Sequence, residues 1–174
     1  MAMLRNPVST DDHCEGSADA PLTLVEYGDY ECPYCGLAYP VVKRLQKHFG
    51  NTLRFVFRNF PLREAHPQAE AAAETAEFAG STGRFWEMHD RLFENQSELG
   101  LELYVSLAEG LDLSSTSLQR ALEAGTYRER VRADFVSGVR SGVNGTPTFY
   151  INGRQHQPSY EFDALAAAMS HILK

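Results

Sequence analysis

The chain has 174 residues, of which 43% are hydrophobic and 22% are charged, and its formal net charge is −7. These values are ordinary for a globular protein, and the length suffices for one domain with a sizeable core or a small domain with an insertion. The acidic balance argues against nucleic acid or an anionic membrane surface as a partner. No apolar run approaches the ~18–20 residues of a membrane span, so we expect no association with a membrane.

The N-terminus and the cysteines bear on the compartment. Residues 1–8 lack the basic start and the apolar segment of roughly 7–15 residues that mark a secretory signal. As given, the chain is therefore expected to be cytoplasmic, whereas a chain trimmed of its signal would be periplasmic or otherwise extracytoplasmic. Three cysteines are too few for a disulfide scaffold. In a reducing compartment, a close pair is more often catalytic, redox-sensing or metal-binding than structural.

The first third of the chain predicts a strand–helix–strand unit. Residues 1–20 carry Ser, Asp, Gly and Pro with little apolar content, and we expect them to form a flexible arm. Residues 22–27 are largely apolar and bounded by proline and glycine, which is typical of a buried strand. Apolar spacing predicts an amphipathic helix from about 38 to 49, and alternation from 53 to 57 predicts a second strand. The default for this order is a parallel pair with a right-handed crossover.

The rest of the chain is first helical and then returns to β structure. From about 65 to 142 strand signals vanish, so this stretch is predicted to be an all-helical insertion that forms its own layer over the sheet. Residues 126–129 read Thr-Tyr-Arg-Glu, the pattern of a capping box that opens a helix. A strand is predicted at 148–151, followed by an Asn-Gly pair at 152–153 that favours a type I′ hairpin turn. Ser159 is expected to cap a final helix.

Cys32 and Cys35 lie at the predicted start of the first helix, separated by Pro33 and Tyr34. A thiol attacks only as thiolate, and its ordinary pKa of about 8.5 leaves little of that form at neutral pH. A helix N-terminus presents unpaired N–H groups and the positive end of the dipole, which favour the anion, and proline is tolerated there. We therefore predict Cys32 as the nucleophile and Cys35, one turn further and more buried, as the thiol that resolves a mixed disulfide.

An acidic residue and a proline-containing stretch give weaker signals. Glu26 interrupts the apolar strand just ahead of the cysteines. Either it faces water at an edge of the sheet, or it is buried with a raised pKa and shuttles protons to Cys35. The stretch Gly-Thr-Pro-Thr at 145–148 either ends a loop or contains a cis peptide, which only ~5–6% of X–Pro bonds in folded proteins adopt. From these residues alone both pairs of alternatives stay open.

Together these motifs resemble the DsbA family of the thioredoxin superfamily. The resemblance rests on the cysteine motif with Glu26 six positions ahead, the helix that contains Pro40, the helical stretch and Val-Asn-Gly-Thr-Pro-Thr-Phe at 143–149, and it runs from about residue 20 to 174. It implies an α/β thioredoxin fold, with a central mixed sheet flanked by helices. The thioredoxin-like domain would comprise residues 21–64 and 143–174, and the helical insertion domain residues 65–142.

The resemblance also implies roles for single residues. Cys32 would be the nucleophile and Cys35 the resolving thiol, and Glu26 matches the buried acid of the family. Pro147 would be a cis-proline that lies against the disulfide, and the backbone of Thr146 would pair with the substrate chain. Pro33 and Tyr34 would complete the active-site loop.

Tyr34 departs from the pattern of the strongly oxidising members, which carry His before the second cysteine. A neutral Tyr34 gives the thiolate no imidazolium partner, and Asp29 and Glu31 add negative charge, so we expect the pKa of Cys32 to lie above that of the strongly oxidising members. A less stabilised thiolate makes a less oxidising disulfide, and we expect a potential below that of the strongest oxidants. The remaining histidines, His66 among them, are scattered without ligand spacing, and we assign them no role.

Other functions are compatible with the same residues. His13 and Cys14 together with Cys32 and Cys35 would supply four ligands for zinc, although a lone CxxC beside strand–helix–strand is more often redox-active. A redox-inactive thioredoxin-like binding module or chaperone would use the groove without turnover. Kappa-class glutathione transferases and hydroxychromene isomerases keep the fold but place Ser where Cys32 stands. Cys14 is also a candidate for a regulatory disulfide with Cys32.

We therefore predict a thiol–disulfide oxidoreductase with cysteine-containing protein substrates and an as yet unidentified redox partner. The disulfide between Cys32 and Cys35 would be the redox group, with no further cofactor and no metal. Analogy of fold predicts a monomer. The direction of electron flow depends on the potential and the partner, so oxidase, reductase and isomerase all stay open.

Overall fold

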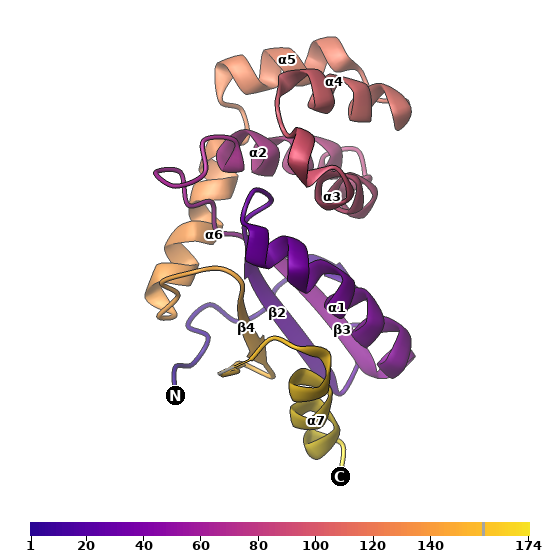
Figure 1. The fold of residues 1–174 in the computed structure, drawn as a ribbon, viewed down its shortest axis with the longest axis vertical. Helices are drawn as coiled ribbons and strands as arrows, with labels where there is room; N and C mark the ends of the chain where they lie inside the picture. The colour runs from indigo at the N-terminus through magenta and orange to yellow at the C-terminus, as the bar shows by residue number, and fades with distance from the viewer. Residues whose placement is uncertain (158) are drawn as a thin grey trace.

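The computed structural model describes residues 1–157 and 159–174, and within these ranges five strands form one mixed sheet (Figure 1). The strand order is β1-β3-β2-β4-β5. The strands are β1 (His13–Glu15), β2 (Leu22–Gly28), β3 (Leu53–Asn59), β4 (Thr148–Ile151) and β5 (Arg154–Gln155). The predicted α/β architecture with a central mixed sheet is confirmed.

The parallel pair β2 and β3 forms the centre of the sheet. The two strands are in register from Leu22 opposite Leu53 to Gly28 opposite Asn59. The helix α1 (Pro33–Phe49) connects them, and its buried side chains recur at helical spacing and join the main core. Both strands are almost entirely buried, which explains the largely apolar sequence of β2, whereas the buried Arg58 of β3 is paired with Asp12. The strand–helix–strand unit expected from the sequence is confirmed.

Between β3 and β4 the described chain is helical. The helices are α2 (Ala69–Gly80), α3 (Phe85–Glu94), α4 (Leu101–Gly110), α5 (Ser115–Ala124) and α6 (Arg128–Arg140). Figure 1 shows α2 to α5 stacked beyond the end of the sheet where α1 begins, and α6 returning beside the sheet. Their buried side chains share a core with α1, and the standing of 65–142 as a separate domain stays a prediction. None of the described helices combines the length and apolar character that a membrane crossing requires.

The C-terminal segment forms a hairpin and a helix. β4 and β5 are joined at Asn152 (φ 46°) and Gly153 (φ 80°), and a type I′ turn requires positive φ at both positions. The last helix, α7 (Phe162–Ile172), adds buried side chains to the main core. The predicted cap is wrong, because this helix begins after Glu161 without a side-chain cap. The Ser159 hydroxyl instead accepts a hydrogen bond from the Glu161 N–H at 3.1 Å.

The predicted capping box at Thr126 is also wrong. The residue that precedes α6 is Tyr127, and its side chain makes no capping hydrogen bond. The reason lies at the end of α5, where Gly125 adopts a left-handed conformation (φ 64°). The Thr126 N–H then donates to the Ala121 carbonyl at 3.0 Å. Thr126 therefore belongs to the termination of one helix rather than to the start of the next.

Residues 1–20 do not form the flexible arm that we predicted. β1 pairs antiparallel with β3, with Cys14 opposite Val56. Arg58 of β3 donates to the carboxylate of Asp12 at 2.8 Å, and both side chains are buried. These contacts join residues that are far apart in the chain, and the segment itself has no local apolar alternation. Its composition alone therefore gave the wrong prediction.

Gly138 lies where α6 packs closely against the sheet. A Cβ at this position would lie 2.7 Å from the Phe60 ring and 3.0 Å from the Tyr27 ring, and both rings are buried. We expect Gly138→Ala to lower the free energy of unfolding by about 1–3 kcal/mol, the usual cost of overpacking a core. Urea unfolding measures this, with Gly145→Ala as the matched control because a Cβ there meets nothing within 4 Å. Equal stability of Gly138→Ala and wild type would contradict the prediction.

Candidate active site

The two cysteines stand at the start of α1. Cys32 is the residue that caps the helix, with extended backbone (φ −65°, ψ 122°), and Pro33 follows in the first turn as predicted. The Gly36 N–H donates to the Cys32 carbonyl at 3.0 Å. Cys32 is 3% exposed, Cys35 is completely buried, and both are free thiols rather than a disulfide. The Cys35 thiol is close enough to donate a hydrogen bond to the Cys32 sulfur.

Local electrostatics separate the two thiols. The pKa of Cys32 is lowered to about 5, and the hydrogen bond from Cys35 is the largest cause. Burial of Cys32 opposes this shift. The Thr146 side chain and the N–H groups of Cys35 and Tyr34 lower the pKa further. Burial, followed by that same hydrogen bond, raises the pKa of Cys35 well above its ordinary value. A pKa of about 5 agrees with the lowering expected at a helix start, and it lies above the ~3.5 of DsbA, as expected for a thiolate without an imidazolium neighbour in its motif.

The loop before β4 brings a distant segment to the cysteines. The Thr146–Pro147 peptide bond is cis, as the resemblance implied. The Thr146 carbonyl oxygen lies 3.5 Å from the Cys32 sulfur. This approach follows from the sheet, since β4 pairs with β2 and places Thr148 opposite Tyr27. The backbone of Thr146 is therefore available directly beside the predicted nucleophile.

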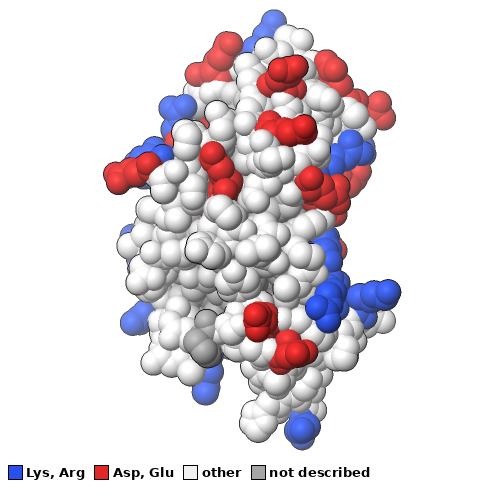
Figure 2. Space-filling view, viewed as in Figure 1, with Lys and Arg blue, Asp and Glu red and all other residues white. Residues whose placement is uncertain are grey.

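Exposed apolar side chains border the cysteine pair. Tyr34 is 60% exposed and Leu37 is 63% exposed. Figure 2 shows an area without charged side chains over the middle of the visible face, with Lys and Arg at its edges, and α1 begins at about this height in the same view of Figure 1. Tyr34 and Leu37 are therefore available to contact another molecule beside the cysteines.

Glu26 is buried rather than at an edge of the sheet. It is 2% exposed and lies in β2 between Phe57 of β3 and Phe149 of β4. Its Oε1 atom has no hydrogen-bond partner among the described residues. Burial, and then the charge of Cys32, raises the pKa of Glu26 to about 8. Glu26 therefore holds a proton at neutral pH, and its charge when ionised contributes to the raised pKa of Cys35.

Buried Asp29 and half-buried His66 form a pair that no sequence pattern indicated. Asp29 is 1% exposed, and its carboxylate accepts hydrogen bonds from the N–H groups of Glu31 (2.8 Å), Cys32 (3.2 Å) and Leu62 (2.9 Å). His66 Nδ1 lies 2.7 Å from the same carboxylate. The histidine comes 37 residues after Asp29, between β3 and α2, so only the tertiary fold brings the two together.

Gln96 is a second residue that sequence reasoning missed. It lies just after α3, and its Nε2 donates to the carbonyls of Tyr30 and Cys32, both at 2.8 Å. A Cβ at Gly36 would clash with the Gln96 amide, so glycine is what allows this close approach. The helical layer thus holds the backbone of the cysteine loop in place.

The four residues considered as zinc ligands do not come together. Cys14 and His13 lie on opposite faces of β1, as adjacent strand residues must. Cys14 packs in a smaller apolar cluster, whereas Cys32 and Cys35 belong to the main core. Within the residues described, no group of three or more His, Cys, Asp or Glu side chains is arranged to hold a metal ion. The same separation argues against a Cys14–Cys32 disulfide.

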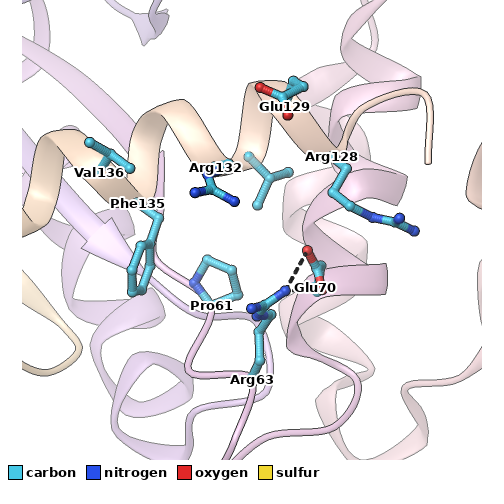
Figure 3. Close-up of a pocket in the computed structure, with 9 residues that line it drawn as sticks. Pro61, Arg63, Glu70, Arg128, Glu129, Arg132, Phe135 and Val136 are labelled. Atoms are coloured by element: carbon cyan, nitrogen blue, oxygen red, sulfur yellow. Dashed lines mark hydrogen bonds and ion pairs between the residues drawn. The ribbon is translucent and has the colours of Figure 1, made fainter.

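A pocket of about 300 Å³ lies between α6, α2 and the segment after β3 (Figure 3). Its lining combines apolar Pro61 and Phe135 with the guanidinium of Arg132. At its rim, Arg63 forms an ion pair with Glu70 at 3.3 Å. None of the predicted site residues lines this pocket, so it is separate from the cysteine site.

Comparisons with known proteins extend these observations. A family model described as thioredoxin matches residues 9–171. The chain is 47% identical over 165 residues to a protein of Salinispora arenicola named Na(+)/H(+) antiporter NhaA 1, and the match covers 94% of this chain and 25% of that protein. The chain thus spans about a quarter of the length of the curated relatives it matches.

Solved structures agree with the fold. BdbD from Bacillus subtilis, in its oxidised form, has a TM-score of 0.89 and 25% identity, with 99% of this chain and 98% of that chain covered. Wolbachia pipientis alpha-DsbA1 has a TM-score of 0.83 and 17% identity, with 97% and 94% covered. The thioredoxin fold and the resemblance to DsbA-like proteins are confirmed. The chain belongs to the thioredoxin family and has the fold of its DsbA-like members.

Proposed function

We propose that the chain is a thiol–disulfide oxidoreductase that exchanges disulfides with cysteine-containing protein substrates through Cys32 and Cys35. The observation that carries this proposal is the opposed state of the two thiols, since the pKa of Cys32 is lowered to about 5 and that of Cys35 is raised. One sulfur is a thiolate at neutral pH, and the other keeps its proton. Two cysteines that only pack in a core would both have raised pKa values, because burial disfavours the thiolate.

In the oxidising direction, a substrate thiolate attacks the Cys32 sulfur of the Cys32–Cys35 disulfide. A substrate–Cys32 bond forms, the intramolecular bond breaks, and Cys35 leaves and takes up a proton. A second substrate thiolate then attacks the substrate sulfur of the mixed disulfide, so that the substrate disulfide forms and Cys32 leaves as a thiolate. Two electrons pass from the substrate to the cysteine pair. A disulfide-bearing redox partner restores the pair by the reverse sequence, and no other cofactor is needed.

Glu26 is proposed to supply and recover the proton of Cys35. The carboxyl is buried and protonated at neutral pH, and water has no direct access to the buried Cys35 thiol. A group whose pKa of about 8 lies near neutrality gives up and regains a proton readily. Glu26 would thus donate as Cys35 leaves and accept when Cys35 attacks.

Substrate recognition is proposed to rest on backbone and apolar contacts. Thr146 would pair with the backbone of an extended substrate segment, since its carbonyl lies 3.5 Å from the Cys32 sulfur. Tyr34 and Leu37, both largely exposed, would contact apolar substrate side chains. Contacts of this kind do not depend on one sequence, which suits a protein that acts on many unfolded substrates.

The pKa of Cys32 also supports an estimate of oxidising strength. A value of about 5 lies between the ~3.5 of DsbA and the ~7 of thioredoxin. Because a more stable leaving thiolate makes a more oxidising disulfide, we propose a reduction potential between about −120 mV and about −270 mV. The chain would then be an oxidant of intermediate strength.

Equilibration in glutathione buffers tests this function directly. The reduced and oxidised forms are separated after acid quenching and alkylation, and the ratio gives the potential. We expect reversible conversion of Cys32 and Cys35 to a disulfide, with catalysis of disulfide formation in a reduced, unfolded protein substrate. An unreactive pair that nevertheless binds unfolded protein would favour the alternative of a binding module.

A further inference from the structure

The Asp29–His66 pair has no assigned role, yet Asp29 contacts both cysteines. The Asp29 carboxylate accepts a hydrogen bond from the Cys32 N–H at 3.2 Å, and the Asp29 N–H donates to the Cys35 sulfur at 3.4 Å. A second carboxylate oxygen accepts from Leu62, in the segment after β3. One acidic residue therefore ties the cysteine loop to the neighbouring loop while it contacts the backbone of Cys32 and the sulfur of Cys35.

A carboxylate in this place carries an electrostatic cost. The Asp29 side chain has no exposed surface, and a negative charge so close to Cys32 disfavours a second negative charge on the sulfur. His66 lies next to this charge, since its Nδ1 is 2.7 Å from the carboxylate, and its side chain is 19% exposed. Solvent can therefore exchange protons with the imidazole, although the Asp29 carboxylate has no contact with solvent.

The surroundings favour the protonated form of His66. Burial lowers the pKa of His66, but the hydrogen bond and charge of Asp29, followed by the charges of Cys32 and Glu31, outweigh burial and raise it. These charged groups come from the end of β2 and the start of α1, on which the His66 loop packs. An interaction between two charges is mutual. Because the Cys32 thiolate stabilises protonated His66, protonated His66 must stabilise the Cys32 thiolate by the same free energy.

We propose that Asp29 and His66 act together as a positioning pair for Cys32: Asp29 holds the cysteine loop through its backbone N–H groups, and protonated His66 cancels the carboxylate's charge and stabilises the thiolate. This inference rests on the proposed function. It supplies, from the loop between β3 and α2, the imidazolium that Tyr34 cannot supply from within the cysteine motif. His66 touches no reacting atom and is a positioning residue, not a catalytic one.

The decisive variant is His66→Asn, whose side-chain amide can keep a donor near the position of Nδ1 but carries no charge. The apparent pKa of Cys32 is read from the pH profile of iodoacetamide alkylation of the reduced protein. We expect this pKa to rise in His66→Asn, which corresponds to an increase of about threefold to tenfold in the proton affinity of the Cys32 thiolate. The equilibrium constant for oxidation of glutathione should fall by a similar factor. The matched control is His171→Asn, an exposed histidine in the last turn of α7, which should change neither value.

A measurement on the wild-type protein covers the case in which His66→Asn does not fold. The His66 imidazole is titrated by NMR in the reduced protein and in the Cys32–Cys35 disulfide form. We expect its proton affinity to be about twofold to tenfold higher in the reduced protein, where the thiolate is present.

Equal titration of His66 in both redox forms, or an unchanged pH profile in a folded His66→Asn protein, would overturn the inference. Either result would leave the proposed function intact, provided that wild type still exchanges with glutathione. If wild type does not exchange at all, the proposed function itself fails. The two failures are therefore distinguishable.

Discussion

Replacing Cys32 with serine is expected to reduce disulfide exchange by at least about 10³-fold, because a serine hydroxyl neither forms a disulfide nor ionises at neutral pH. The proposed function makes Cys32, whose pKa is lowered, the attacking and leaving sulfur of the pair. Oxidation of a reduced protein substrate, followed by gel shift after alkylation, measures the loss.

Cys35→Ser should behave differently from Cys32→Ser. This variant keeps the thiolate of Cys32 but lacks the resolving sulfur, so we expect it to accumulate a mixed disulfide with substrate that non-reducing gels reveal. Cys14→Ser is the matched control and should retain the wild-type rate, because Cys14 packs in a separate cluster. Equal residual activity in Cys32→Ser and Cys35→Ser, with no trapped substrate in either variant, would contradict the proposal that Cys32 attacks first and Cys35 resolves the mixed disulfide.

Glu26→Gln is expected to make the reduced protein more stable at pH 7 while making it a slower enzyme. Burial, then the Cys32 charge, raises the pKa of Glu26 from 4.5 to about 8, so the folded state favours the protonated carboxyl. Wild type therefore loses stability as pH rises from about 4.5 to about 8, and the loss at pH 7 is about 3 kcal/mol. A neutral glutamine avoids this loss. Urea unfolding at pH 4 and pH 7 measures the difference, which should be present only at pH 7.

The kinetic half of this prediction concerns Cys35. Without a proton acceptor beside it, Cys35 should resolve a mixed disulfide about 10²-fold more slowly, within the usual range for removal of a general base. Glu74→Gln is the matched control, since Glu74 is also buried with a raised pKa but lies on α2. That variant should alter the pH dependence of stability and leave resolution unchanged. Unaltered resolution in Glu26→Gln would show that Cys35 loses its proton by another route.

The parts of the fold that follow local rules were predictable. The apolar run of β2, the helical spacing of α1 and the Asn152-Gly153 turn each depend on a few adjacent residues. The position of Cys32 and Cys35 at a helix start was predictable for the same reason, since Pro33 and the apolar spacing that follows are local signals. Glu26 was ambiguous until β3 and β4 were placed on either side of its strand.

The missed features all depend on residues far apart in the chain. The pairing of β1 with β3 and the contact of His66 with Asp29 arise only when the sheet and loops assemble. Only the family resemblance placed Thr146 beside Cys32, because the two residues are 114 positions apart in the chain.

The short outer strands of the sheet have a consequence for association. β1 covers one side of β3 with three residues, and on the other side the two-residue β5 is bridged to Met3. A long open rim would recruit further chains and lead to aggregates. Because both outer strands are short and the N-terminal segment covers the β5 side, the sheet offers an extended polypeptide little edge to pair with, and the proposed substrate contact at Thr146 would meet little competition from the rims.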